Sequence, residues 1–284
     1  MRSGGLIRSL KPHIRVRVSI IGLLCPLLFG SCWDPQAAAT VHIVGHGGLG
    51  TGAGLLMDTP ASLRGALDLG ADGIEMDVQM TRDGELVVFH DMHLGVLTSC
   101  TGRINDLTWD QLEPCRYGTL EPGSRIMRLA DLKAVLADRK ATEIVLDVKL
   151  MTSGDWSTYL DELATNLAGI IAANGWTERV RVECRIPEFL EVLGGKGEVK
   201  RSLYCDDLNE GAITAERLGL QGLTLNQRNV TREEVRSARA KGLHVSLFGV
   251  DGRISLALAL RKNPDALQVD ELPAILRMLE NSGP

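Results

Sequence analysis

Two pairs of charged residues, each set in an apolar run, are the first chemical feature of this sequence. Glu75 and Asp77 are two residues apart, and Asp147 and Lys149 repeat that spacing in the run Glu143–Leu150. On a strand, residues two apart project to the same face. Three carboxylates that converge repel one another unless a positive charge lies between them. Oxygen-only ligands suit a hard ion, so we expect one divalent cation, Mg²⁺ or Ca²⁺, on Glu75, Asp77 and Asp147.

Two histidines and a lysine complete the candidate catalytic groups. His46 ends the first apolar run, and His90 ends a run that follows Asp77 after a turn. Histidines titrate near neutral pH, so one can act as acid and the other as base. Lys149 can bind an anion, and Gly47, which has no side chain, lets a ligand approach the backbone closely. Together with a hard cation, these groups predict cleavage of a phosphodiester.

A scaffold has to bring these residues together at the ends of strands. Short apolar runs, typical of buried parallel strands, alternate with amphipathic stretches typical of helices. The expected strands are Val41–Gly45, Gly73–Val78, Glu143–Leu150, Arg179–Cys184, Arg201–Cys205, Gly222–Leu225, Leu243–Phe248 and Ala266–Val269. The expected helices are Ser62–Leu69, Leu129–Ala137, Trp156–Ala173, Pro187–Leu193, Gly211–Leu218, Thr231–Lys241, Arg253–Lys262 and Pro273–Leu279. This alternation predicts an α/β fold, the (β/α)8 TIM barrel, with an open doubly wound sheet as the alternative.

One segment departs from the alternation. Glu85–His90 is typical of an extra strand soon after the second one, and the Asp83-Gly84 pair before it indicates a tight turn. The chain therefore turns back after Asp77 and brings His90 close to it. The expected fold is a barrel with a small hairpin insertion after the second strand, followed by a long loop region.

Length and charge limit the domain organisation and the partners. The chain has 284 residues, and a TIM barrel needs roughly 250, so residues 40–284 are expected to form one domain. The net charge of −5 and the 4% aromatic content give no reason to expect a nucleic-acid partner.

The N-terminus is expected to be a targeting segment. The basic residues before the apolar run are Arg2, Arg8, Lys11, Arg15 and Arg17. The run Val18–Gly30 is too short to span a bilayer, so residues 1–39 are predicted to be a signal peptide and short linker. A buried N-terminal helix is the alternative. Cleavage at Ala37–Ala39 and lipidation of Cys32 remain equally open, so we expect a secreted, periplasmic or cell-surface lipoprotein.

Four cysteines remain after this segment. An exported chain meets an oxidising compartment, where an even number of cysteines favours disulfides. Cys100 and Cys115 are expected to close a short loop. Cys184 and Cys205 end two successive apolar runs and are either bridged or free buried thiols.

The motifs around the candidate residues resemble the glycerophosphodiester phosphodiesterase family. The segments that carry this resemblance are His46-Gly47-Gly48, Gly70–Val78, Thr81–Gly84 and Val87–Asp91, with weaker likeness at Leu146–Lys149, Phe248–Asp251 and Val269–Pro273. The resemblance implies a (β/α)8 barrel that hydrolyses glycerophosphodiesters to an alcohol and glycerol 3-phosphate. It also implies a divalent cation on the three acids, with His46 and His90 as acid and base.

Three departures from the family pattern bear on the substrate. Gly47 stands where the family usually has Arg, and Asp147 stands where it usually has Glu. The segment Leu56–Thr59 replaces Pro-Glu-Asn-Thr, which predicts the loss of an acid near the site. Asp147 and the disulfide-closed loop resemble the related spider-venom sphingomyelinase D branch. A phospholipase D-like enzyme acting on lysophospholipid or sphingomyelin, or a non-catalytic binding scaffold, are therefore the alternatives.

Overall fold

The computed structural model describes residues 40–118, 124–137 and 139–281, which fold as a closed barrel. The parallel strands of the barrel are β1 (His42–Gly45), β2 (Gly73–Met80), β5 (Glu143–Val148), β6 (Val180–Cys184), β7 (Lys200–Tyr204), β8 (Gly222–Asn226), β9 (His244–Val250) and β10 (Ala266–Val269). β1 pairs with both β10 and β2, which closes the sheet on itself. The (β/α)8 prediction is therefore confirmed, and the open sheet is excluded.

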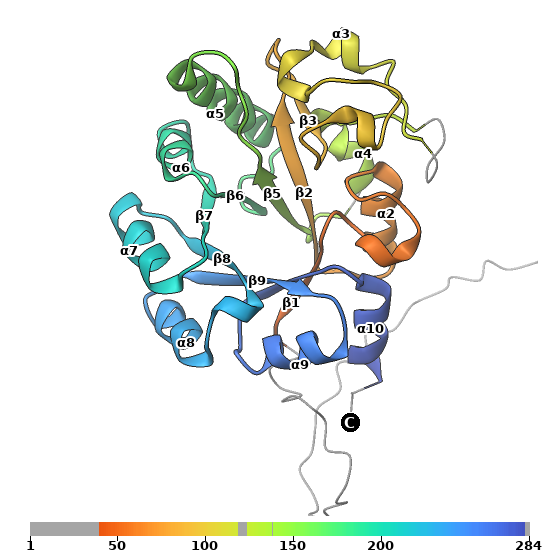
Figure 1. Cartoon of the computed structure of the whole chain (residues 1–284). Helices are drawn as coiled ribbons and strands as arrows, with labels where there is room; N and C mark the ends of the chain where they lie inside the picture. The colour runs from red at the N-terminus through yellow and green to blue at the C-terminus, as the bar shows by residue number, and fades with distance from the viewer. Residues whose placement is uncertain (1–39, 119–123, 138, 282–284) are drawn as a thin grey trace, which may run out of the picture. The chain divides into compact units, whose positions relative to one another are not determined.

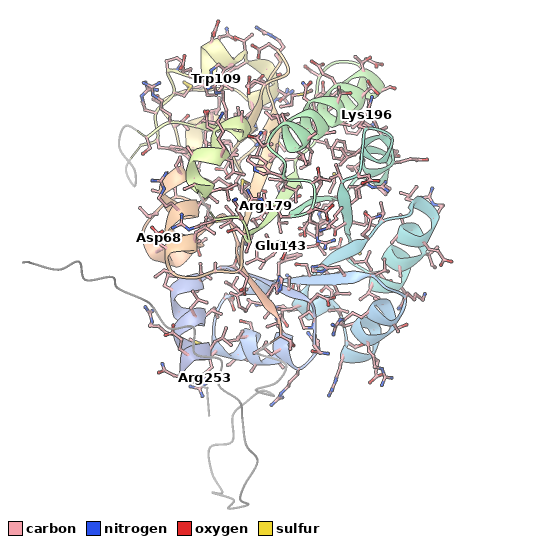
Figure 2. The ribbon with its side chains drawn as sticks, turned by 180° about the vertical axis from the view of Figure 1, so that it is seen from behind. Asp68, Trp109, Glu143, Arg179, Lys196 and Arg253 are labelled. Atoms are coloured by element: carbon pink, nitrogen blue, oxygen red, sulfur yellow. A yellow bond between two sulfur atoms is a disulfide. The ribbon has the colours of Figure 1, made fainter. Side chains whose placement is uncertain are left out.

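Helices form a ring around the strands (Figure 1). They are α2 (Pro60–Asp68), α4 (Leu132–Leu136), α5 (Trp156–Ala173), α6 (Pro187–Gly194), α7 (Leu208–Leu218), α8 (Arg232–Ala240), α9 (Arg253–Leu260) and α10 (Leu272–Glu280). Short 3₁₀ segments are η1 (Thr51–Ala53), η2 (Leu94–Val96), η3 (Ile104–Asp106), η4 (Leu129–Asp131) and η5 (Gln227–Asn229). Figure 2, from the opposite side, shows Glu143 of β5 near the centre of this ring, whereas Asp68 and Arg253 lie on surrounding helices.

The apolar core lies between the strands and the helices, and the interior of the barrel is largely polar. On β2, the outward residues Ile74, Met76 and Val78 belong to the main apolar cluster. Glu75 and Asp77 alternate with them and are equally buried, so they point into the barrel. The fold thus places carboxylates inside the barrel, where they need a counter-charge.

The hairpin insertion is present as predicted, with a shorter strand. β3 (Leu86–Val88) runs antiparallel to the end of β2, and β4 (Met127–Arg128) adds to β3. Between β3 and β4 lies α3 (Trp109–Leu112), beside β3 in Figure 1. This part has its own apolar cluster, which includes Phe89, Ile104 and Leu112. The predicted Cys100–Cys115 disulfide is formed inside it.

The second pair of cysteines is not bridged. Cys184 and Cys205 are free thiols. Cys184 is in register with Leu203 on the neighbouring strand, two residues before Cys205, and its thiol donates to the Val148 carbonyl. The alternative of free thiols is therefore the correct one.

The predicted signal peptide and Cys32 lie in residues 1–39, outside the described part of the chain. These predictions remain predictions. Among the described residues, no helix combines the length and the apolar character needed to cross a bilayer.

Candidate active site

Three buried carboxylates meet at the C-terminal ends of β2 and β5. Asp77 is in register with Asp147 across the two strands, and Glu75 precedes Asp77 on the same face. One oxygen from each of these three residues lies within 4.8 Å of the others. The expected convergence of the three acids is therefore observed.

This cluster fits a divalent cation. Burial raises the pKa of Glu75 and of Asp147, although His46 opposes the shift at Glu75 and Lys149 opposes it at Asp147. One carboxylate oxygen of Asp77 (Oδ2) is buried and has no hydrogen-bond partner among the described residues. An all-oxygen donor set with an orphaned buried oxygen suits a hard ion such as Mg²⁺ or Ca²⁺.

Lys149 lies directly over these acids. It follows β5, and its Nζ is 2.9 Å from the Asp77 carboxylate and also donates to Asp147. Burial disfavours the charge of the lysine, but the two carboxylates outweigh it and raise its pKa. Lys149 therefore stays cationic, with a side chain that is partly exposed at the mouth of the barrel.

His46 is held against the acids by a partner that the sequence analysis did not assign. Its Nδ1 bonds to the Asp270 carboxylate at 2.6 Å, and its Nε2 is 3.7 Å from Glu75. Burial opposes protonation, but Glu75 and Asp270 outweigh it and raise the pKa of His46 to about 9. An acid directly after the last strand was the available signal, since β10 is paired with β1.

His90 lies on the wall built by the hairpin. The backbone N–H of Phe89 donates to the Asp77 carbonyl at 3.0 Å, which ties this segment to the strand with the acids. The His90 Nδ1 bonds to Asp91 at 2.8 Å, and its side chain is 54% exposed. Within the described residues, no contact joins His90 to the three carboxylates, so the structure brings it to the same mouth but not into the cluster.

Gln79 is a second positioning residue that the sequence analysis missed. It lies two residues beyond Asp77 on the inner face of β2 and is buried. Its amide nitrogen donates to the carbonyls of Phe89 (2.6 Å) and Asp91 (3.1 Å), the residues on either side of His90. Gln79 therefore fixes the segment that carries this histidine.

Two of the departures from the family pattern are coupled by packing. Gly47 has a left-handed φ of +57°, and a Cβ added there would lie 2.5 Å from the Cβ of Met57. Met57 therefore occupies the space that a side chain at position 47 would need. The Gly47 N–H donates to Glu75 at 2.9 Å. Its contact with substrate remains a prediction.

The predicted loss of an acid in Leu56–Thr59 is wrong. Asp58 is buried beside the cluster, and its Oδ1 accepts from the backbone N–H of Asp77 at 3.1 Å. Burial and the neighbouring Asp77 raise the pKa of Asp58 well above its usual value. The acid was missed because its position depends on a left-handed residue (φ +62°) that turns it inward.

A TIM barrel with three carboxylates, a lysine and two histidines at its C-terminal mouth defines a class of barrel with a candidate cation centre. Comparison with known proteins identifies the family within that class. Residues 46–273 match the Glycerophosphoryl diester phosphodiesterase family, and the chain belongs to this family.

Individual relatives agree with this assignment. The chain is 36% identical to the glycerophosphodiester phosphodiesterase of Caldanaerobacter subterraneus over 86 residues. This matched segment covers 29% of this chain and 35% of that protein. The chain spans about a third or less of the curated relatives it matches first.

Two solved structures show the same fold. One is a glycerophosphodiester phosphodiesterase from Parabacteroides distasonis, with a TM-score of 0.74, 18% identity, and coverage of 85% of this chain and 98% of that one. The other is a phosphodiesterase from Oleispira antarctica in complex with the product sn-glycerol-3-phosphate. Its TM-score is 0.73 at 21% identity, and it covers 87% of this chain and 99% of that one.

Proposed function

We propose that this chain hydrolyses glycerophosphodiesters to an alcohol and glycerol 3-phosphate. The observation that carries the proposal is the cluster of Glu75, Asp77 and Asp147 under Lys149, at the mouth of a barrel of this family. The product bound to the Oleispira antarctica protein, which shares the fold, supports a substrate of the same class. Phosphodiester cleavage uses these groups because charge on the phosphoryl oxygens must be neutralised as the bond breaks.

The three carboxylates would hold one divalent cation, Mg²⁺ or Ca²⁺. When bound, such an ion neutralises phosphoryl oxygens as a Lewis acid. Lys149 binds a further phosphoryl oxygen as a fixed cation. The orphaned oxygen of Asp77 supports this use of the acids, because a buried carboxylate oxygen without a partner is costly.

His46 and His90 transfer the protons. One takes the proton of the attacking water, and the other gives a proton to the alcohol oxygen as the P–O bond breaks. Each ring has its Nδ1 bonded to a neighbouring acid, Asp270 for His46 and Asp91 for His90. This arrangement leaves Nε2 of each ring for the proton transfer.

Export and membrane attachment are separate proposals that rest on residues 1–39. A signal peptide and a lipidated Cys32 would place the site outside the cytoplasm. Labelling cells with a radioactive fatty acid tests the attachment, and Cys32→Ser should abolish the label. Unchanged labelling of this variant would contradict it.

The activity is tested with glycerophosphocholine, lysophosphatidylcholine and sphingomyelin, each with Mg²⁺ or Ca²⁺ and with EDTA. We expect turnover of glycerophosphocholine that EDTA removes. His46→Ala and His90→Ala should each lower kcat by at least about 100-fold, the usual contribution of an acid or base. His42→Ala is the matched control, because His42 is exposed at the opposite end of β1. Cleavage of the two lipids alone would favour a phospholipase D-like enzyme instead.

A further inference from the structure

A second cation, Arg185, stands on the rim of the mouth, at the end of the strand that neighbours β5. Asp147 of β5 is in register with Glu183 of β6. Lys149 directly follows β5 and Arg185 directly follows β6, so each cation stands at the C-terminal end of its strand. Because β5 and β6 are neighbouring parallel strands, both cations belong to the same rim of the barrel.

The side of β6 that carries Arg185 faces the barrel interior. Glu183 accepts hydrogen bonds from Thr224 on β8 (2.6 Å) and Gln268 on β10 (2.9 Å), neither of which is on a strand next to β6. Only a side chain inside the barrel can reach both. β6 ends at Cys184, so Arg185 directly follows the strand. Continuing the alternation of the strand by one residue puts Arg185 on the inner side at the mouth.

An aromatic wall holds the guanidinium of Arg185. Its Cζ is 3.9 Å from the centroid of the Tyr204 ring at the end of β7. Tyr204 in turn meets Phe248 of β9 edge-on, with 5.0 Å between the ring centroids. Both rings, on β7 and β9, lie on the side of β6 away from β5. Arg185 therefore leans away from Lys149 and from the carboxylate cluster.

The remaining partner of Arg185 is weak. Its two terminal nitrogens are 3.3 and 3.5 Å from the Asp206 carboxylate oxygens, and the two side chains are 53% and 69% exposed. Exposed ion pairs contribute little to stability. A stacked guanidinium keeps its N–H groups in the plane of the fork, which matches a carboxylate or a phosphate.

We propose that Arg185 forms a subsite for an anionic group, a carboxylate or a phosphate, on the alcohol half of the substrate. This inference rests on the proposed hydrolysis of glycerophosphodiesters. In the proposed reaction, the scissile phosphate binds at Lys149 and the carboxylate cluster on β2 and β5. Arg185 leans toward β7, so it meets a group further along the substrate. The rim there is open to solvent, which fits the half whose size varies between substrates.

Glycerophosphoserine and glycerophosphoethanolamine test the subsite, because they differ by one carboxylate. We expect the wild type to prefer glycerophosphoserine by kcat/KM. Arg185→Gln should lower the ratio of the two kcat/KM values by roughly tenfold, the lower end for a lost charge-assisted hydrogen bond. Arg185→Lys, which keeps the charge but loses the fork, should give an intermediate ratio and a second reading if the first variant does not fold. A second pair, glycerophosphoglycerol with and without a terminal phosphate, separates a phosphate from a carboxylate.

Arg217→Gln is the matched control, since this exposed arginine ends α7 on the side away from the mouth. The ratio of the two kcat/KM values in this variant should equal that of the wild type. Turnover of both substrates with the same ratio in Arg185→Gln and wild type would overturn the subsite but not the hydrolysis. Failure of the wild type to cleave any of these substrates would overturn the hydrolysis itself.

Discussion

Whether a site residue could be predicted from the sequence depends on how far along the chain its partners lie. Glu75, Asp77, Asp147 and Lys149 could be found from the sequence, because strand periodicity places each pair on one face. Asp270 directly follows the last strand, which marks it as a candidate, but its partner is not predictable because the bond to His46 spans 224 residues and requires β10 to close on β1. Asp58 was missed for a local reason, its left-handed backbone.

Gly47 and Met57 offer a test at the residue scale. Gly47→Ala should lower the free energy of unfolding by roughly 2–4 kcal/mol, because it combines a left-handed φ with a clash against the Met57 Cβ. The double variant with Gly47→Ala and Met57→Gly should recover the part of the lost free energy of unfolding that the clash causes. Urea unfolding curves measure both, with Met57→Gly alone as the control. A double variant with no recovery would show that the two positions are not coupled.

At the scale of elements, the hairpin was predictable and its attachment was not. The Asp83-Gly84 turn and the run after it indicate β3 directly. The amide of Gln79 that holds the ends of the His90 segment leaves no pattern in the sequence, because a glutamine inside a strand has many uses. The single disulfide was predicted from its short spacing, whereas the second pair remained open.

Gln79→Ala should separate proton transfer from cation binding. The variant loses both bonds that fix the segment around His90, so we expect kcat to fall by roughly 10–100-fold. The three carboxylates keep their places, and titration calorimetry with Ca²⁺ or Mn²⁺ should give the wild-type affinity. A loss of cation affinity that matches the loss of kcat would assign Gln79 to the cation centre instead.

The Cys100–Cys115 disulfide should stabilise the insertion. Replacing both residues with Ser removes a cross-link over 15 residues, which costs roughly 2–3 kcal/mol by loop entropy. Thermal melts with and without a reductant measure the effect. The melting temperature of Cys184→Ser should still fall with reductant, because that thiol is free. A wild-type melt that is insensitive to reductant, with the bond shown to be cleaved, would contradict this role.

The whole molecule is a barrel with a polar interior, and this interior makes its stability depend on pH. Burial raises the pKa of Glu183 to about 7, although its hydrogen bonds from Thr224 and Gln268 act against the shift. The folded state therefore binds this proton more tightly than the unfolded chain does. The resulting stability is complete below the unfolded value of 4.5 and is lost as the pH rises through about 7.

Glu183→Gln should remove this contribution to the pH dependence. Between pH 5 and pH 8 the wild type should lose roughly 2–3 kcal/mol relative to the variant, the size of a shift of this kind. Urea unfolding of both proteins at the two pH values gives the difference. Parallel pH curves for the two proteins would mean that Glu183 is ionised in the fold at both values.

Closure of the barrel was predictable from the alternation of runs, but the bonds inside it were not. Glu183 is 41 residues from Thr224 and 85 from Gln268, and they meet only because β6, β8 and β10 surround one interior. Periodicity identifies which residues point inward. It does not identify which inward residues meet across the barrel.

β2 carries two ligands of the proposed cation, Glu75 and Asp77, and it also pairs with β3 of the hairpin. β2 pairs with β1 and β5 inside the barrel and with β3 outside it, and the Phe89–Asp77 bond continues that ladder to His90. Backbone hydrogen bonds therefore tie this wall of the mouth to the barrel. Around Tyr204 and Phe248, which lie on strands away from β2, the mouth is lined by an edge-on ring contact instead. A molecule that contacted both His90 and Tyr204 would therefore span the mouth of the barrel.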